Sequence, residues 1–134
     1  MSEVQGNGRR VLVVDDDPDT ALMFAELLKQ LGHAVDYVTS SQAVVDVAKR
    51  LRPWLVFLDI GMPVMDGFEM IRRLRELPDY KSVPAIALSG YASQKDAASA
   101  IAAGFNAHVS KPVDPRELIA LVDQLLRNKS ELDG

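Results

Sequence analysis

Three consecutive aspartates, Asp15 to Asp17, end an apolar run near the start of the chain, and Asp59 ends another. Ser89 and Lys111 follow two further apolar stretches in the same way. Carboxylates with space for water are typical Mg²⁺ ligands, and a lysine beside a hydroxyl suits a phosphoryl group. A carboxylate beside a metal ion can also act as a nucleophile and form an aspartyl phosphate. These residue types predict metal-assisted phosphoryl chemistry if the fold brings them together.

The elements that must position these residues are five apolar runs that alternate with helical patterns. We expect buried strands at 10–15, 33–38, 54–59, 83–89 and 106–110. Continuous apolar strands separated by helices indicate a parallel sheet covered on both faces, which is a doubly wound α/β fold. In such folds ligands bind beyond the carboxyl ends of the strands, so all the residues above are expected at one edge.

Capping signals predict where the helices begin and end. The Asp17–Pro18 and Asp114–Pro115 pairs are typical of a cap followed by the first helical residue. The second helix is expected to be capped by Ser40 or Ser41, and an alanine-rich helix is expected to run from Ser93 to Gly104. Because Asp17 serves Pro18 as a cap, only the first two aspartates of the run remain for a metal.

Composition excludes several functional classes. With 15 basic and 19 acidic residues the formal net charge is −4, which argues against direct nucleic-acid binding, and the absence of cysteine excludes thiol chemistry. The apolar runs are too short to span a membrane, and the first residues lack the apolar middle of a signal peptide. We therefore expect a cytoplasmic protein with a flexible lead-in at 1–9, one domain at 10–127 and a polar tail at 128–134.

Four stretches occur together in an order that resembles one protein family. They are VLVVDDDP, LVFLDIGMPVMDG, ALSGYA and AHVSKPVD, and the resemblance covers about residues 10 to 127. The chain resembles the receiver domain of two-component response regulators, and its motifs are most similar to those of receivers in hybrid histidine kinases or stand-alone regulators. The resemblance implies a flavodoxin-like (βα)5 three-layer sandwich with the strand order 2-1-3-4-5.

The resemblance also implies a role for each residue at the strand ends. Asp59 resembles the phosphoacceptor, while Asp15 and Asp16 resemble the acidic pair that holds Mg²⁺ together with Asp59 and the backbone carbonyl of Gly61. Lys111 resembles the phosphate-pairing lysine, and the Lys111–Pro112 bond matches one that is typically cis.

Ser89 and His108 correspond to the switch positions of the family. Ser89 resembles the switch hydroxyl, and His108 stands where many relatives carry an aromatic switch residue. The resemblance implies that Asp59 accepts a phosphoryl group from a histidine kinase or a histidine phosphotransfer protein. The result would be a changed protein-interaction surface rather than turnover of a substrate, with the last two helices available for a partner or a homodimer.

Two alternatives remain open on the sequence alone. In a haloacid-dehalogenase-type phosphatase, Asp15 would be the nucleophile of an Asp-x-Asp motif, with Ser89 and Lys111 as later motifs. In a receiver-like scaffold, the domain would bind a partner without being phosphorylated. The first alternative places the covalent intermediate on Asp15 rather than Asp59, and the second places none.

Overall fold

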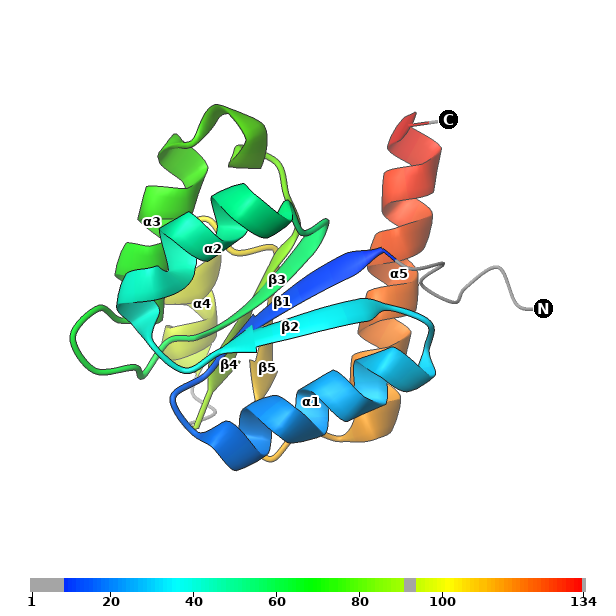
Figure 1. Cartoon of the computed structure of the whole chain (residues 1–134), viewed down its shortest axis with the longest axis horizontal. Helices are drawn as coiled ribbons and strands as arrows, with labels where there is room; N and C mark the ends of the chain where they lie inside the picture. The colour runs from blue at the N-terminus through cyan, green and yellow to red at the C-terminus, as the bar shows by residue number, and fades with distance from the viewer. Residues whose placement is uncertain (1–8, 91–93, 134) are drawn as a thin grey trace.

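A five-stranded parallel sheet in the order β2-β1-β3-β4-β5 forms the centre of the molecule (Figure 1). The computed structural model describes residues 9–90 and 94–133, and its side chains at 9–90 and 98–127; the expected helix start Ser93 and nearly all of the lead-in fall outside these ranges. The sheet confirms the predicted flavodoxin-like topology. Its strands, β1 to β5, are Arg10–Val14, Ala34–Val38, Leu55–Asp59, Ala85–Ser89 and Ala107–Ser110.

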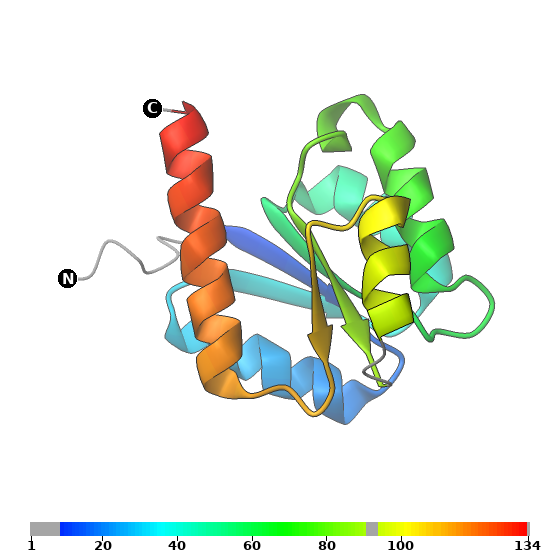
Figure 2. The ribbon, with the colours of Figure 1, turned by 180° about the vertical axis from the view of Figure 1, so that it is seen from behind.

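Helices cover both faces of the sheet and complete a three-layer sandwich. Figures 1 and 2 show α1 and α5 on one face and α2, α3 and α4 on the other. Within the described residues, no helix is long and apolar enough to cross a lipid bilayer. The helices are α1 Pro18–Gln30, α2 Val44–Leu51, α3 Gly67–Glu76, α4 Gln94–Ala103 and α5 Pro115–Asp133, with short 3₁₀ turns η1 Ser41–Ala43 and η2 Pro78–Tyr80.

The apolar strands supply side chains to two separate cores. In β1, Val11 and Val13 pack with the α1 and α5 side, while Leu12 and Val14 pack with the α2, α3 and α4 side. All four side chains are fully buried. Because successive side chains of a strand point to opposite faces, a strand covered on both faces must be apolar along its length. This requirement explains the continuous apolar runs of the sequence.

The predicted caps Asp17 and Asp114 are confirmed, the latter by a hydrogen bond from the Arg116 amide at 2.9 Å, and the predicted serine cap of α2 is wrong. The Asp17 carboxylate accepts hydrogen bonds from the Asp19 amide at 3.2 Å and the Thr20 hydroxyl at 2.7 Å at the start of α1. The structure places Ala43 at the cap position of α2, and neither Ser40 nor Ser41 caps it, because the short η1 turn separates these serines from the helix.

The last helix differs from the sequence expectation. α5 continues to Asp133, so nearly all of the stretch 128–134 that we expected as a polar tail is helical. Polar residues do not by themselves end a helix, because Lys and Glu, like Leu, are good helix formers. The stretch also contains no glycine or proline before Gly134.

Arg75 joins α3 to the neighbouring end of α4 and to the loop before β4. Its guanidinium donates hydrogen bonds to the carbonyl of Gly104 at 2.8 and 3.2 Å, to that of Tyr80 at 2.9 Å and to that of Val83 at 2.6 Å. It also donates to the Asn106 side chain at 3.1 Å. One half-buried cation thus satisfies three backbone carbonyls in two separate parts of the chain.

Replacing Arg75 is therefore expected to destabilise the whole domain. Arg75→Met should lower the free energy of unfolding by about 2–4 kcal/mol, because it removes several hydrogen bonds from one charged group and leaves carbonyls unpaired. Urea denaturation measures the change. Arg73→Met on the same helix removes only an exposed ion pair with Glu69 and should have a much smaller effect. Equal losses in the two variants would contradict the role of Arg75.

Candidate functional site

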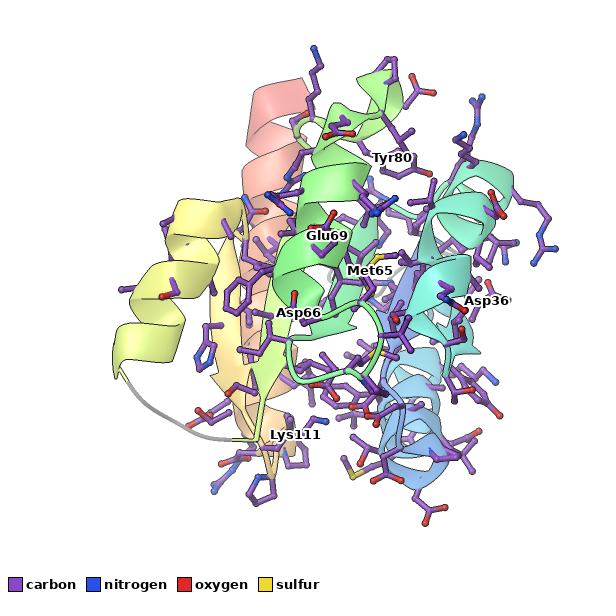
Figure 3. All side chains as sticks on the ribbon, turned by 90° about the vertical axis from the view of Figure 1, so that its left-hand side faces the viewer. Asp36, Met65, Asp66, Glu69, Tyr80 and Lys111 are labelled. Atoms are coloured by element: carbon purple, nitrogen blue, oxygen red, sulfur yellow. The ribbon has the colours of Figure 1, made fainter. Side chains whose placement is uncertain are left out.

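The carboxyl ends of β1, β3, β4 and β5 bring the candidate residues to one edge of the sheet. Asp59 pairs with Leu88 of β4, and Ser89 pairs with Ser110 of β5, directly before Lys111. Figure 3 shows Lys111 at this end of the sheet and Tyr80 at the opposite end. Asp15, Asp59 and Ser89 are 0, 6 and 2 % exposed. Buried carboxylates at a sheet edge require compensation by cations or hydrogen bonds.

Three carboxylates form a compact acidic cluster at this edge. Asp15, Asp16 and Asp59 each offer one oxygen, and these oxygens lie within 4.8 Å of one another. Asp16 is exposed, whereas its two partners are buried. The predicted metal-binding carboxylates are thus brought together, with one of them facing solvent where a hydrated ion can enter.

Lys111 supplies positive charge between the two buried carboxylates. Its ammonium nitrogen lies 2.6 Å from Asp15 Oδ2 and 3.1 Å from Asp59 Oδ2. Burial tends to lower the pKa of Lys111, but contact with the carboxylates of Asp15 and Asp59 outweighs burial and raises it. Lysine therefore stays charged and acts as the counter-ion of the cluster.

The environment of Asp15 disfavours its ionised form. Burial raises the pKa of the Asp15 carboxyl, and contact with Lys111 and the Asp17 amide offsets only part of this effect. The close approach of Lys111 lacks hydrogen-bond geometry, so Asp15 Oδ2 is buried without a hydrogen-bond donor among the described residues. A buried carboxylate oxygen with an unused lone pair is well suited to a hard cation.

Short turns fix the orientation of both buried carboxylates. Asp15 Oδ1 accepts a hydrogen bond from the Asp17 amide, and Asp59 Oδ1 accepts one from the Gly61 amide, each at 2.9 Å. Gly67 holds the loop after β3 close to the strand, because a Cβ at this position would lie 2.5 Å from the Cα of Ile60. The Asp66–Gly67 pair is typical of a turn, but nothing in the sequence signals this close approach.

The remaining predicted residues lie on β4, β5 and the segment after β5. Ser89 ends β4, and its carbonyl accepts a hydrogen bond from the Lys111 amide at 2.7 Å. The Lys111–Pro112 peptide bond is cis, as predicted. His108 is half-buried opposite Ala87, whose side chain belongs to the core under α3 and α4. Its Nε2 is buried and has no hydrogen-bond partner within the described part of the chain.

Comparison with known proteins identifies the class to which this site and fold belong. The family model for the response regulator receiver domain matches residues 11–123. The chain therefore belongs to the response regulator receiver family, and it is a receiver domain of the two-component signalling type. This match leaves the haloacid-dehalogenase-type alternative without support.

Individual relatives agree with the family match. The chain is 46 % identical over 114 residues to an uncharacterized 14.6 kDa protein in the sodA1 3′ region of Leptolyngbya boryana, covering 85 % of this chain and 87 % of that protein. It is 32 % identical over 123 residues to the DNA-binding response regulator MtrA of Mycolicibacterium smegmatis, covering 92 % of this chain and 53 % of MtrA. The chain thus spans about half the length of MtrA and similar curated regulators.

Solved structures share the same fold. A CheY-like receiver domain protein from Methanospirillum hungatei superposes with a TM-score of 0.83 at 27 % identity, covering 94 % of this chain and 98 % of that one. The Vibrio cholerae chemotaxis protein CheY4 gives a TM-score of 0.82 at 27 % identity, covering 87 % and 97 % of the two chains.

Proposed function

We propose that this receiver domain accepts a phosphoryl group on Asp59 from a histidine kinase or a histidine phosphotransfer protein. The observation that supports this role most directly is the position of Asp59: buried, fixed by the Gly61 amide and 3.1 Å from the Lys111 ammonium. It is also the only carboxylate of the acidic cluster on β3, which lies between β1, followed by Asp15 and Asp16, and β4, which ends in Ser89. The domain would catalyse only its own phosphorylation and dephosphorylation.

The donor set fits Mg²⁺ as the cofactor. Asp15, Asp16 and Asp59 would hold the ion together with the backbone carbonyl of Gly61, and water would complete its coordination. The Oδ2 of Asp15, which accepts no hydrogen bond among the described residues, and the exposure of Asp16 support this assignment. When bound, Mg²⁺ would neutralise charge on the oxygens of the transferring phosphoryl group.

The chain's own residues supply the rest of the chemistry. An Asp59 oxygen forms the new bond to phosphorus while the bond from phosphorus to the donor's imidazole nitrogen breaks and its electron pair returns to the imidazole. The Lys111 ammonium lies where it can pair with a phosphoryl oxygen, and its three donors allow it to keep contact with Asp15. Water later hydrolyses the aspartyl phosphate.

Ser89 and His108 would carry the signal away from the site. The Ser89 hydroxyl would move to donate a hydrogen bond to the phosphoryl group, which would shift the end of β4 and the position of α4. His108, under α3 and α4, would respond to that shift. The changed surface over α4 and α5 would bind a downstream protein or a second copy of the domain, and the acidic net charge disfavours direct nucleic-acid contact. We place this activity in the cytoplasm.

Site mapping of the phosphoryl group tests this function. The chain is treated with acetyl phosphate and Mg²⁺, and borohydride then reduces the acyl phosphate so that the modified aspartate becomes homoserine. Peptide mass mapping is expected to find homoserine at position 59. Label at Asp15 would instead favour the phosphatase mechanism, and no label at all would favour a scaffold that is not phosphorylated.

A groove beside the site is suited to the protein that donates the phosphoryl group. It has a volume of about 240 Å³ and lies between α1 and the start of α5. Met23 is 50 % exposed there, and Val113 lies two residues after Lys111. An exposed methionine in an apolar groove that includes Val113 is expected to contact a donor whose histidine reaches Asp59.

Met23→Asp is therefore expected to slow phosphorylation by a protein donor but not by a small-molecule donor. Transfer from a phosphorylated histidine phosphotransfer protein that reacts with the wild-type chain should slow by about tenfold, because a charge in the apolar groove opposes docking. Phosphorylation by acetyl phosphate should be unchanged. Ile101→Asp on α4, which is 53 % exposed but away from the groove, is the control. Equal slowing with both donors would contradict a docking role for the groove.

A further inference from the structure

The loop between β3 and α3 contains a residue in a strained backbone conformation. Val64 has a positive φ of 70°, which a β-branched side chain rarely adopts, and its side chain is 83 % exposed. The Met65 amide donates a hydrogen bond to the Pro63 carbonyl at 2.8 Å, which closes a tight turn around Val64. Because an exposed valine gains little from packing, other contacts must hold this loop.

Ser41 provides such a contact from a distant part of the chain. Its hydroxyl donates a hydrogen bond to the same Pro63 carbonyl at 3.1 Å across a separation of 22 residues. Ser41 is only 3 % exposed, although serine is usually a surface residue. It does not cap α2, so capping does not account for this buried hydroxyl.

The loop that Ser41 holds at Pro63 leads directly to the acidic cluster. Pro63 lies two residues after Gly61, whose amide contacts Asp59 Oδ1 at 2.9 Å. Between them, Met62 is buried in the core. A change of backbone conformation at Pro63 or Val64 would therefore be transmitted to Gly61, because so few bonds separate them.

We propose that Ser41 is a positioning residue for the metal and phosphoryl site. Its hydroxyl holds the Pro63 carbonyl, keeps Val64 in its strained turn and thereby fixes the Gly61 backbone beside Asp59. This inference rests on the proposed function, because it assigns Ser41 to the site at which Mg²⁺ and the phosphoryl group would bind. Figure 3 shows Met65 and Asp66 on the same loop beside α3, away from Lys111 at the strand ends.

A Mg²⁺ titration followed by amide chemical shifts tests the proposal. Ser41→Ala is expected to weaken Mg²⁺ binding about fivefold, because the loop loses one net hydrogen bond. The amides of Gly61 and Met65 should also shift before metal is added. Ser40→Ala is the matched control, since Ser40 is an exposed neighbour without a side-chain cap hydrogen bond. It should bind Mg²⁺ like the wild-type chain.

Unfolding by urea in EDTA distinguishes positioning from general stabilisation. A merely structural serine would lower the stability of Ser41→Ala while the Mg²⁺ Kd stays at its wild-type value, and that result would overturn the proposal. If the wild-type chain itself binds no Mg²⁺, the proposed function fails and this inference fails with it. Wild-type binding with an unchanged Kd in Ser41→Ala rejects the role of Ser41 alone.

The Val64→Gly background tests the link to backbone strain. Glycine adopts a positive φ without strain, so the loop should need less support from Ser41. The effect of Ser41→Ala on the Mg²⁺ Kd is therefore expected to be smaller in Val64→Gly than in the wild-type chain. An undiminished effect would show that the hydroxyl does not act against the strain at Val64.

Discussion

Phosphorylation is expected to disappear in the Asp59→Asn variant with both acetyl phosphate and a phosphohistidine donor. The amide that replaces the carboxylate is a poor nucleophile and carries no charge. The fold should be retained, because asparagine keeps the oxygen that accepts the Gly61 amide hydrogen bond. Phosphorylation is measured by intact mass after each treatment, and circular dichroism checks the fold.

A neighbouring carboxylate provides the matched control for this result. Asp66 belongs to the same loop, but its side chain caps α3 by accepting the Glu69 amide at 3.0 Å, a role that asparagine also performs. Asp66→Asn should therefore be phosphorylated like the wild-type chain. A phosphoryl group that persists in Asp59→Asn would place the acceptor elsewhere, with Asp15 as the next residue to examine.

The residues at the strand ends could be predicted because their positions depend on local pattern and topology. Apolar runs that end in Asp15, Asp59, Ser89 and Lys111 indicate parallel strands, and parallel strands present their carboxyl ends at one edge. Asp17 could be separated from the metal site for a similar reason, since the following proline indicates a helix cap. Each of these inferences needed only neighbouring residues.

Contacts between distant segments could not be predicted in this way. The hydrogen bond from Ser41 to Pro63 depends on where η1 lies relative to the loop after β3, whereas the local sequence predicts a helix cap at this serine. Arginines of an amphipathic helix usually face solvent, yet Arg75 donates hydrogen bonds to the carbonyls of Gly104, Tyr80 and Val83. Hydrophobic periodicity specifies which face of a helix is buried, but not which polar groups meet at its ends.

Replacing Asp15 by asparagine is expected to make the metal-free domain more stable and to weaken Mg²⁺ binding. Because burial raises the pKa of Asp15, the folded state holds its proton more tightly than the unfolded state does. This contribution to stability is complete below the unfolded pKa, near 3.8, and is lost as the pH rises through the folded pKa. As the pH rises to neutrality, the fully buried Asp15 carboxyl therefore destabilises the metal-free fold relative to acidic pH, despite its contact with Lys111.

Asp15→Asn is expected to be more stable than the wild-type chain at pH 7 in EDTA, by about 1 kcal/mol. Its stability should also decrease less as the pH rises above 3.8. Its Mg²⁺ affinity should fall by about 10- to 100-fold, because a ligand is lost. Urea denaturation between pH 3.8 and pH 7, with EDTA or with Mg²⁺, measures the stability, its dependence on pH and the Mg²⁺ affinity.

Asp16→Asn separates metal binding by Asp15 and Asp16 from the effect of a buried carboxylate on metal-free stability. Asp16 is exposed, so its replacement should weaken Mg²⁺ binding with little change in metal-free stability. Mg²⁺ should then stabilise the wild-type chain by about 2.7 kcal/mol at 100 times its Kd and either variant by less at the same concentration. If Asp15→Asn is instead less stable than the wild-type chain in EDTA at every pH, attraction to Lys111 outweighs burial, and the carboxylate contributes to folding as well as to the proposed metal site.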